Sequence, residues 1–467
     1  MEKKSNKFYH YGSKGEPKIS QSKLINFLGE KGFALMKVGE GKILVKIVEN
    51  IVEEVDEGVL SRFISNHLKS ENELDVLEVF IRGLASYLNK RKYDLLPIVN
   101  VISDKHLKDS AFFYFSNTAV RITKGKVEQI PYKKLNHKIW NKRILDRAFN
   151  PVPQGIGQFE DFCNKLAAED PKRLEALKSC IGYLVHRYNN PSLVKAIILL
   201  DENARSGGLT NGGTGKSLLY KALSHCSETV LIDGKNTKSQ SRFSNQRIGL
   251  STDIICFDDV ISTFNLTDIY SMSTSGIVIE KKGKDEFSLK PEESPKIMIT
   301  SNYPVNGPGG SSDARRRYEF EVSSYFSDRH TPKDEYGNLL FDEWSEDEWN
   351  KFDNFIIECL QSFLNNGLIE PKSLKLKVNR LIQNTSIEFN EFVTNNPPNT
   401  EKWIDKKVFL KQFKDFSIHM KDITPHLLTK WVKQYALENN LEYVDKKTGE
   451  KYEFKLIKKS SDEEKQN

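Results

Sequence analysis

The sequence is poor in cysteine and has no long apolar run. Its 467 residues include five cysteines, no two of which lie within four positions of each other, so the spacing excludes a zinc knuckle. An odd number of cysteines without a pairing pattern is typical of a reducing compartment. No stretch of about 18 apolar residues is present, and the polar N-terminal segment lacks the apolar core of a signal peptide. We therefore expect a soluble, cytoplasmic protein.

Two further absences narrow the function. The nine histidines are scattered, so no histidine and cysteine cluster predicts a metal site. The N-terminal region has no Asp-x-Asp pair on an apolar run, so the paired carboxylates of a polymerising domain are missing and primase activity is not predicted. The net charge of +6 is the small difference between 70 basic and 64 acidic residues. Any nucleic-acid surface must therefore come from local clustering of charge.

What the sequence does contain is a glycine-rich segment, LTNGGTGKSLL, at residues 209–219. The apolar strand KAIILLD precedes it and an amphipathic helix begins at Lys216, which is the context of a phosphate-binding loop. Thr210 stands where the usual pattern has its first glycine, and the alternative is a surface turn before a helix. Backbone amides would hold the phosphates, Lys216 would reach the β- and γ-phosphates, and Ser217 would bind Mg²⁺. The predicted nucleotide site consists of Gly212, Gly213, Thr214, Gly215, Lys216 and Ser217.

Three weaker signals follow in order. The apolar run IICFDD ends in Asp258, which would orient Mg²⁺, and Asp259, a candidate general base; the alternative is a strand followed by an acidic turn. A second apolar strand, KIMITSN, ends at Asn302, whose amide could hold an attacking water or sense the γ-phosphate; the alternative is a common turn. The segment SSDARRRYEF carries arginines that could stabilise transition-state charge or form a solvated basic patch, namely Arg315, Arg316 and Arg317.

In this order, the phosphate loop, acidic pair, TSN and arginines resemble the superfamily 3 helicases, which are AAA+-related hexameric motors of viruses, phages and plasmids. The likeness is greatest to the phage primase-helicase branch related to poxvirus primase-helicases. It covers roughly residues 113–349 and includes IGYLVHRY, DGKNTKSQSRF and LFDEWSEDEWNKFDNF. The resemblance implies ATP and Mg²⁺ as ligands. It also implies an arginine finger that acts on a neighbouring subunit, for which we favour Arg316.

That family also carries a basic β-hairpin that reaches into the pore of the ring. The corresponding segment here is VIEKKGKDEFSLKPEESPKIMITSN, with strands expected at residues 278–280 and 287–289. Its tip would present Lys281, Lys282 and Lys284. Lysines in a pore can follow a phosphate backbone without reading its sequence, whereas the alternative is a charged surface hairpin.

The predicted fold class is α/β, because buried apolar strands alternate with helices in the middle of the chain. We expect a P-loop NTPase (AAA+-like) core with an α+β N-terminal region, a helical collar and a C-terminal winged-helix-like domain. The predicted divisions are a disordered N-terminus (1–20), an N-terminal α+β domain (21–150), a helical collar (151–194), the ATPase domain (195–370), the winged-helix-like domain (371–459) and a disordered tail (460–467). For the last domain, duplex DNA binding and a packing or protein-binding role remain equal alternatives.

The predicted function is that of a ring-forming, hexameric DNA helicase that hydrolyses ATP. The resemblance implies movement on single-stranded DNA, 3′ to 5′, and unwinding of forked DNA during replication of a phage, prophage or mobile element. It also implies a separate primase or polymerase as a partner. The alternatives are a translocase, loader or defence ATPase that does not unwind DNA, and an origin-binding protein whose nucleotide site controls assembly.

Overall fold

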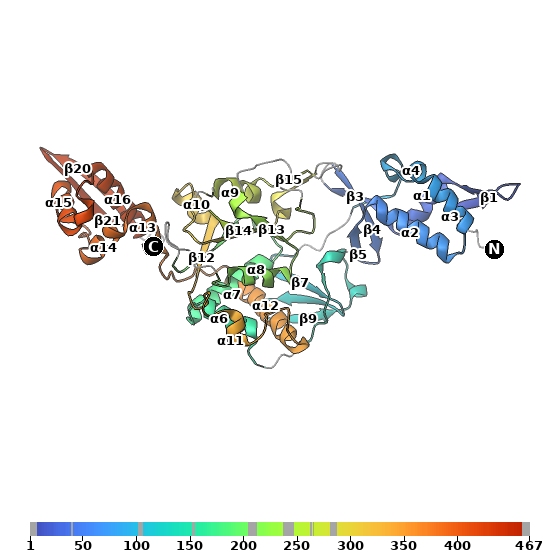
Figure 1. Ribbon diagram of the computed structural model, residues 1–467, viewed down its shortest axis with the longest axis horizontal. Coiled ribbons are helices and arrows are strands. Elements are labelled where there is room, and N and C mark those ends of the chain that lie inside the picture. The colour runs from blue at the N-terminus through green and yellow to red at the C-terminus, as the bar shows by residue number, and fades with distance from the viewer. Residues whose placement is uncertain are drawn as a thin grey trace, which may run out of the picture.

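The computed structural model describes residues 7–38, 41–100, 106–151, 155–203, 213–236, 247–261, 264, 266–280 and 287–459. Three units follow one another along an elongated molecule, with a central α/β unit between an N-terminal and a C-terminal unit (Figure 1). Within the described ranges, every helix is too short or too polar to cross a membrane.

The N-terminal unit packs helices on one face of a mixed sheet. In chain order its elements are β1 (Tyr9–Tyr11), β2 (Pro17–Ile19), α1 (Gln21–Glu30), β3 (Phe33–Val38), β4 (Gly41–Val48), β5 (Ile51–Glu54), α2 (Glu57–Ser70), α3 (Leu74–Arg82), α4 (Leu84–Tyr87), α5 (Lys90–Tyr93) and β6 (Ile98–Val99). Successive side chains of a strand point to opposite faces. Phe33 and Leu35 therefore join the core under the helices, whereas Ala34 and Met36 join a core shared with the central unit.

Residues 7–20 differ from the disorder predicted for residues 1–20, of which residues 1–6 lie outside the described residues. Strands β1 and β2 pair antiparallel, with Tyr9 opposite Ile19. Tyr9 is only 5% exposed, and its hydroxyl donates a hydrogen bond of 2.7 Å to Glu73, the residue before α3. Phe8 is fully buried in the same core. A few aromatic side chains thus fix a segment whose composition is otherwise polar, and composition alone could not predict this.

The central unit is built on a five-stranded parallel sheet with the order β13-β14-β17-β12-β18. Its strands are β12 (Ala196–Asp201), β13 (Thr229–Asp233), β14 (Ile254–Val260), β17 (Lys296–Ser301) and β18 (Arg317–Val322). The strands predicted from KAIILLD, IICFDD and KIMITSN are confirmed as β12, β14 and β17. Both faces of the sheet are buried: Ile197 and Leu199 pack into one core, and Ile198 and Leu200 pack into the other. Burial on both faces explains why these strands read as continuous apolar runs.

Helices and a small second sheet surround this parallel sheet. The other elements of the central unit are β7 (Ser110–Phe115), β8 (Ala119–Thr123), β9 (Val127–Ile130), η1 (Tyr132–Lys134), η2 (Asn141–Arg143), β11 (Ile144–Leu145), α6 (Gln158–Leu166), α7 (Pro171–Val185), α8 (Lys216–Ser224), η3 (Gly234–Asn236), α9 (Leu266–Thr274), β15 (Ile277–Ile279), β16 (Phe287–Leu289), η4 (Pro291–Glu293), α10 (Gly310–Arg316), α11 (Pro332–Tyr336) and α12 (Glu346–Asn366). Strand β10 (Ile139–Trp140) instead pairs with β5 at the edge of the N-terminal sheet. In Figure 1, α6, α7 and α12 lie together on one side of the parallel sheet.

The cores do not follow the predicted divisions at residues 150 and 194. One continuous core contains Phe113 of β7, Leu177 of α7, Leu199 of the parallel sheet and Leu360 of α12. The segment 111–132, which the predicted division places in the N-terminal domain, is instead part of a sheet ordered β11-β7-β8-β9 that shares the core of the central unit. The helices expected as a separate collar share this core. Local periodicity identified the helices and strands, but tertiary contacts decide where the units divide.

The C-terminal unit has its own core. Its elements are α13 (Leu376–Asn384), α14 (Ile387–Asn395), β19 (Ile404–Asp405), α15 (Lys406–Phe416), η5 (Ile418–Met420), α16 (Pro425–Glu438), β20 (Leu441–Thr448) and β21 (Lys451–Lys458). The strands form an antiparallel sheet with the order β19-β21-β20. The helix pair followed by a strand pair agrees with the order expected from the sequence. Phe413, Trp431 and Phe454 pack together in this core, whereas α13 ties the unit to the central sheet. The tail expected at residues 460–467 lies outside the described residues.

Candidate nucleotide-binding and hydrolysis site

The predicted phosphate loop connects β12 to α8. Residues 204–212, which include Thr210 and Gly212, lie outside the described residues. Gly213 and Gly215 have φ angles of 86° and 98°, a region of backbone conformation that favours glycine. A Cβ atom on Gly215 would lie 2.8 Å from the ring of Phe162, so a side chain there would also clash with α6. Gly215 is the N-cap of α8, and it places the free amides of the first helical turn at the carboxyl edge of the sheet.

Lys216 is buried at the start of α8, with 8% of its surface exposed. Its Nζ atom donates to Oδ1 of Asp201 and, at 2.9 Å, to Oδ1 of Asn302. Asp201 ends β12 and Asn302 follows β17, so the lysine lies between neighbouring strands of the sheet. Ser217 is exposed beside it. A buried ammonium with acidic and amide partners at a helix N-terminus is suited to anion binding.

The acidic pair ends β14 at a distortion of the strand. The pairing of β14 with β17 shifts between Phe257 and Val260, and Asp259 has a φ of 51°. Thr300 holds both acids: its hydroxyl donates to Asp258 Oδ1 at 2.6 Å and accepts the backbone N–H of Asp259 at 2.8 Å. A non-glycine residue in the left-handed region is strained, and such residues cluster at functional sites. The two successive carboxylates have different partners, because Asp258 contacts Thr300 whereas Asp259 contacts Asn302 and Lys235.

Asn302 and Lys235 hold the carboxylate of Asp259 from two sides. The Nδ2 atom of Asn302 donates to Asp259 Oδ1 at 2.7 Å, and Lys235 forms an ion pair with Oδ2. Lys235 follows β13, the strand next to β14, and the hydrogen bond with Asp259 raises the pKa of Lys235. The structure therefore joins Lys216, Asn302 and Asp259 in one chain of hydrogen bonds at the C-terminal ends of the parallel strands.

Sequence reasoning missed three residues of this arrangement. Asp201 is the last residue of the apolar run KAIILLD, Thr300 lies inside the strand KIMITSN, and Lys235 follows the strand TVLID. A signal for each was present, because polar residues at the carboxyl ends of parallel strands meet at one edge of the sheet. Which of them touch each other depended on the strand order, which the sequence does not state.

The three candidate arginines have different surroundings. Arg317 is largely buried: its guanidinium lies 3.4 Å from Asp313 and 3.6 Å from Glu319, and it donates to the carbonyl of Val305. Burial lowers its pKa, but the two carboxylates outweigh burial and the pKa is raised overall. Arg315 is exposed, and Arg316 is half-exposed with its guanidinium 5.7 Å from the ring centroid of Tyr270. Arg317 thus serves the structure of its own subunit, which leaves Arg315 and Arg316 as finger candidates.

The arginines lie near the N-terminal ends of the parallel strands, whereas the phosphate loop lies at their C-terminal ends. Arg317 begins β18 and is level with Ala196, the first residue of β12, whereas the phosphate loop follows the last residue of that strand. At about 3.3 Å per residue, the six residues of β12 separate these ends by about 20 Å. These arginines are therefore remote from Lys216 of their own chain, and a role in hydrolysis requires a second subunit.

The two strands of the expected basic hairpin are present. Strand β15 pairs antiparallel with β16, with Ile277 opposite Leu289. Ile277, Ile279 and Leu289 are buried in the core shared with the parallel sheet, which anchors the hairpin. Lys281, Lys282 and Lys284 lie outside the described residues.

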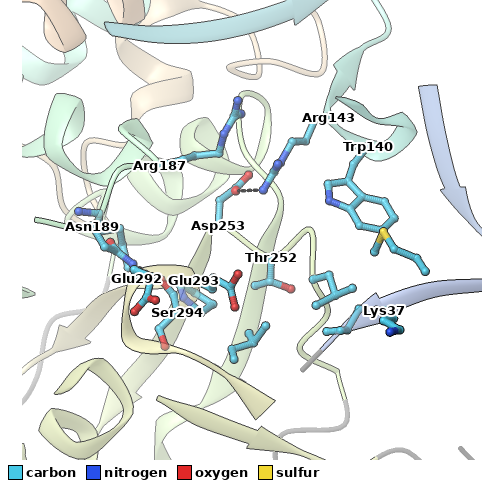
Figure 2. A pocket seen from close by; sticks show the side chains of 16 residues that line it. Lys37, Trp140, Arg143, Arg187, Asn189, Thr252, Asp253, Glu292, Glu293 and Ser294 are labelled. Atoms are coloured by element: carbon cyan, nitrogen blue, oxygen red, sulfur yellow. Dashed lines mark hydrogen bonds and ion pairs between the residues drawn. The ribbon is translucent and has the colours of Figure 1, made fainter. Parts of the chain in front are cut away.

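A pocket of about 190 Å³ lies at the other end of the sheet, between the N-terminal and central units. Figure 2 shows Arg143 pairing with Asp253 in it, at 2.7 Å. Lys296, at the start of β17, also lines this pocket, and burial lowers its pKa to about 7. Its Nζ donates to the carbonyl of Tyr188 at 3.1 Å and lies 4.0 Å from the ring centroid of Tyr183. The pocket is at the amino ends of β14 and β17 and is separate from the nucleotide site.

Comparisons with known proteins add likenesses in structure only. No family model matches the sequence, and no curated protein matches it. The apo structure of the NrS-1 C terminal region (305-718) is 13% identical, with 93% of this chain and 98% of that chain covered and a TM-score of 0.47. The A form apo structure of the same region is 12% identical, with 93% and 99% covered and a TM-score of 0.46. A JCV helicase bound to a substituted phenyl acetamide is 14% identical, with 51% and 64% covered and a TM-score of 0.26. At these TM-scores the function has to be inferred from the geometry of the site itself.

Proposed function

We propose that the chain is an ATP-hydrolysing, ring-forming DNA helicase of the superfamily 3 type. One observation supports this most: the predicted lysine, acidic pair and asparagine meet at the carboxyl edge of one parallel sheet. Strand β17 lies between the phosphate-loop strand β12 and the acidic strand β14. That order places Asn302 in hydrogen-bond contact with both Lys216 and Asp259. Ligands of open α/β sheets bind at this edge.

The described residues of this site fit a nucleoside triphosphate with Mg²⁺. Gly215 allows the close approach of backbone that a phosphate cradle needs, and Lys216 is the buried cation at its centre. Ser217 and Asp258 would hold Mg²⁺, with Asp258 oriented by Thr300. When bound, Mg²⁺ supplies positive charge that neutralises the phosphates in the transition state.

Asp259 is the proposed general base. Asn302 and Lys235 fix its carboxylate, so it would accept a proton from a water in line with the γ-phosphate without reorientation. The side chain of Asn302 contacts both Lys216 and Asp259. Phosphate binding at Lys216 would therefore alter the position of the Asp259 carboxylate through Asn302. In the ring, Arg316 or Arg315 of the adjacent subunit would complete the site, since these residues are remote from the site of their own chain.

Two surfaces are proposed to contact DNA. The β15–β16 hairpin would carry Lys281, Lys282 and Lys284 to single-stranded DNA in the pore, with movement 3′ to 5′. The C-terminal unit would contact duplex at a fork. Residues 401–459 contain 14 basic and 9 acidic residues, a net charge of +5, which nearly equals that of the whole chain. Along α16, His426, Lys430 and Lys433 are exposed on one stripe, as expected of a helix that meets DNA.

Steady-state ATP hydrolysis tests the proposal, measured with and without single-stranded DNA for the wild type and Lys216→Ala. We expect DNA to stimulate the wild type and the variant to be inactive. Absence of hydrolysis by the wild type under both conditions would contradict a motor. Unwinding of a forked duplex then distinguishes a helicase from a translocase, loader or defence ATPase, which would hydrolyse ATP without separating strands. Tight duplex binding with negligible turnover would instead indicate an origin-binding protein.

A further inference from the structure

Asp201 is a buried acid at the centre of the candidate site, and no role was predicted for it. It is the last residue of β12 and is 7% exposed. Its Oδ1 atom accepts hydrogen bonds from Lys216 Nζ and from Thr214 Oγ1. Both donors belong to the phosphate loop. The carboxylate therefore contacts Lys216, the donor that the proposed function assigns to phosphate oxygens, and a second side chain of the same loop.

The bonding capacity of Lys216 is already used. An ammonium group has three N–H donors. In the described structure they are directed to Asp201 Oδ1, to Asn302 Oδ1 at 2.9 Å and to Thr214 Oγ1 at 3.3 Å. A phosphate oxygen can become a partner of this lysine only if one of these bonds opens. The phosphate and the Asp201 carboxylate are both anionic and repel each other, so the bond to Asp201 is the one expected to open.

The backbone that carries Asp201 is held in place, so opening would be a movement of its side chain. The next residue, Glu202, donates its N–H to the carbonyl of Val322 at 2.9 Å. The carbonyl of Glu202 accepts from Asn379 at 2.9 Å, and its carboxylate accepts from the N–H of Ser324 at 3.0 Å. These contacts anchor the end of β12 to β18 and to α13.

We propose that Asp201 competes with the nucleotide phosphates for Lys216, and thereby sets the affinity of the site for nucleotides. In the empty site, Asp201 neutralises a buried ammonium that would otherwise be costly. On binding, the phosphate takes its place. The inference rests on the proposed function, because it assumes that Lys216 binds phosphate.

Nucleotide titration of Asp201→Asn tests the competition. The amide keeps the shape of the side chain but removes the charge that holds Lys216. We expect the Kd for ADP and for ATPγS to fall at least about tenfold, since a hydrogen bond to a charged group is removed only from the empty state. The Kd for adenosine, which has no phosphate, should not change. Asp347→Asn is the control, because it removes a carboxylate at an exposed position on α12, and it should leave all three values unchanged.

Two further measurements keep the inference testable if Asp201→Asn does not fold. Asp201→Ser offers a smaller neutral side chain and should show the same tightening for ADP. A crystal structure of the wild type with ADP needs no variant: the distance between an Asp201 carboxylate oxygen and Lys216 Nζ should exceed 4 Å. Retention of that ion pair with ADP bound, or unchanged or weaker ADP affinity in folded variants, would overturn the inference. Failure of the wild type to bind either nucleotide would instead overturn the proposed function and this inference together.

Discussion

Asn302 donates its side-chain amide to Asp259 at 2.7 Å, on the strand next to its own. The oxygen of the same amide accepts from Lys216 at 2.9 Å. One side chain therefore connects the residue proposed to bind phosphate with the residue proposed to activate water. The contact explains why an amide is needed here: it must donate on one side and accept on the other, which a carboxylate or an ammonium cannot do.

Replacement of Asn302 by alanine should separate binding from hydrolysis. We expect kcat for ATP to fall roughly 100-fold, because Asp259 loses a hydrogen bond that orients it as a base. The Kd for ATPγS should change only a few-fold, because the phosphate loop is intact. Rapid-quench hydrolysis and nucleotide titration measure the two quantities. Asn365→Ala, at an exposed position on α12, is the matched control. A loss of binding as large as the loss of turnover would assign Asn302 to the phosphate cradle instead.

The three neighbouring arginines should respond differently to substitution. Arg317→Ala removes the partner of Asp313 and Glu319 in a largely buried cluster, so we expect the free energy of unfolding to fall by about 3 kcal/mol. Arg315→Ala and Arg316→Ala alter exposed or half-exposed side chains, and both should unfold within about 0.5 kcal/mol of the wild type. Urea titrations compare all three. Equal stability of the Arg317 and Arg316 variants would contradict the structural role of Arg317.

A mixing experiment tests whether the finger acts between subunits. Arg316→Ala and Lys216→Ala should each be nearly inactive alone, the first by a factor of roughly 10³ if Arg316 is the finger. Mixed oligomers of the two variants would contain some interfaces with an intact lysine facing an intact arginine, so ATP hydrolysis should partly return. No recovery in co-assembled mixtures, with Arg315→Ala as inactive as Arg316→Ala, would argue against Arg316 as the single finger.

Most of the candidate site could be predicted because its signals are local. An apolar strand that ends in a polar residue is visible in the sequence, and Lys216, Asp258, Asp259 and Asn302 all follow such strands. Asp201 and Lys235 end or follow strands too, yet their partners depend on strand order. The role of Arg317 could not be predicted either, because Asp313 and Glu319 neutralise it only after α10 and β18 have folded together. Likewise, the core that unites Phe113 with Leu360 crosses two predicted domain boundaries, since such contacts are made between residues far apart in the chain.

Two buried histidines predict a loss of stability in acid. His186 is almost fully buried near His106, and burial lowers the pKa of His186 from 6.5 to about 4. Burial also lowers the pKa of His106 well below 6.5. Between about pH 6.5 and pH 4 the unfolded chain binds protons that the folded chain does not, so the free energy of unfolding should fall as the pH falls through this window. Each histidine contributes a slope of up to about 1.4 kcal/mol per pH unit.

The variant His186→Gln isolates this effect. Glutamine keeps a donor that can serve the carbonyl of Leu107, which His186 contacts at 3.0 Å, but it does not titrate. Urea unfolding between pH 7 and pH 4.5 should show a shallower dependence than in the wild type. His419→Gln changes an exposed histidine and should leave the dependence as it is. An unchanged slope in His186→Gln would show that other groups dominate the acid sensitivity.

Charge reversal on α16 tests whether the C-terminal unit contacts duplex DNA. Lys430 and Lys433 are exposed on the same stripe of the helix, whereas Trp431 and Val432 between them are buried in the core. Lys430→Glu with Lys433→Glu should therefore weaken duplex binding roughly tenfold and lower the salt dependence of binding by about 0.9 for each phosphate that the helix no longer neutralises. ATP hydrolysis stimulated by single-stranded DNA should persist, because the pore hairpin is untouched. Lys172→Glu with Lys333→Glu, at exposed positions on α7 and α11, makes the same change in net charge and is the control. If duplex affinity and its salt dependence do not change, the basic stripe is not a DNA surface, and the unit is better explained as a module that packs against protein.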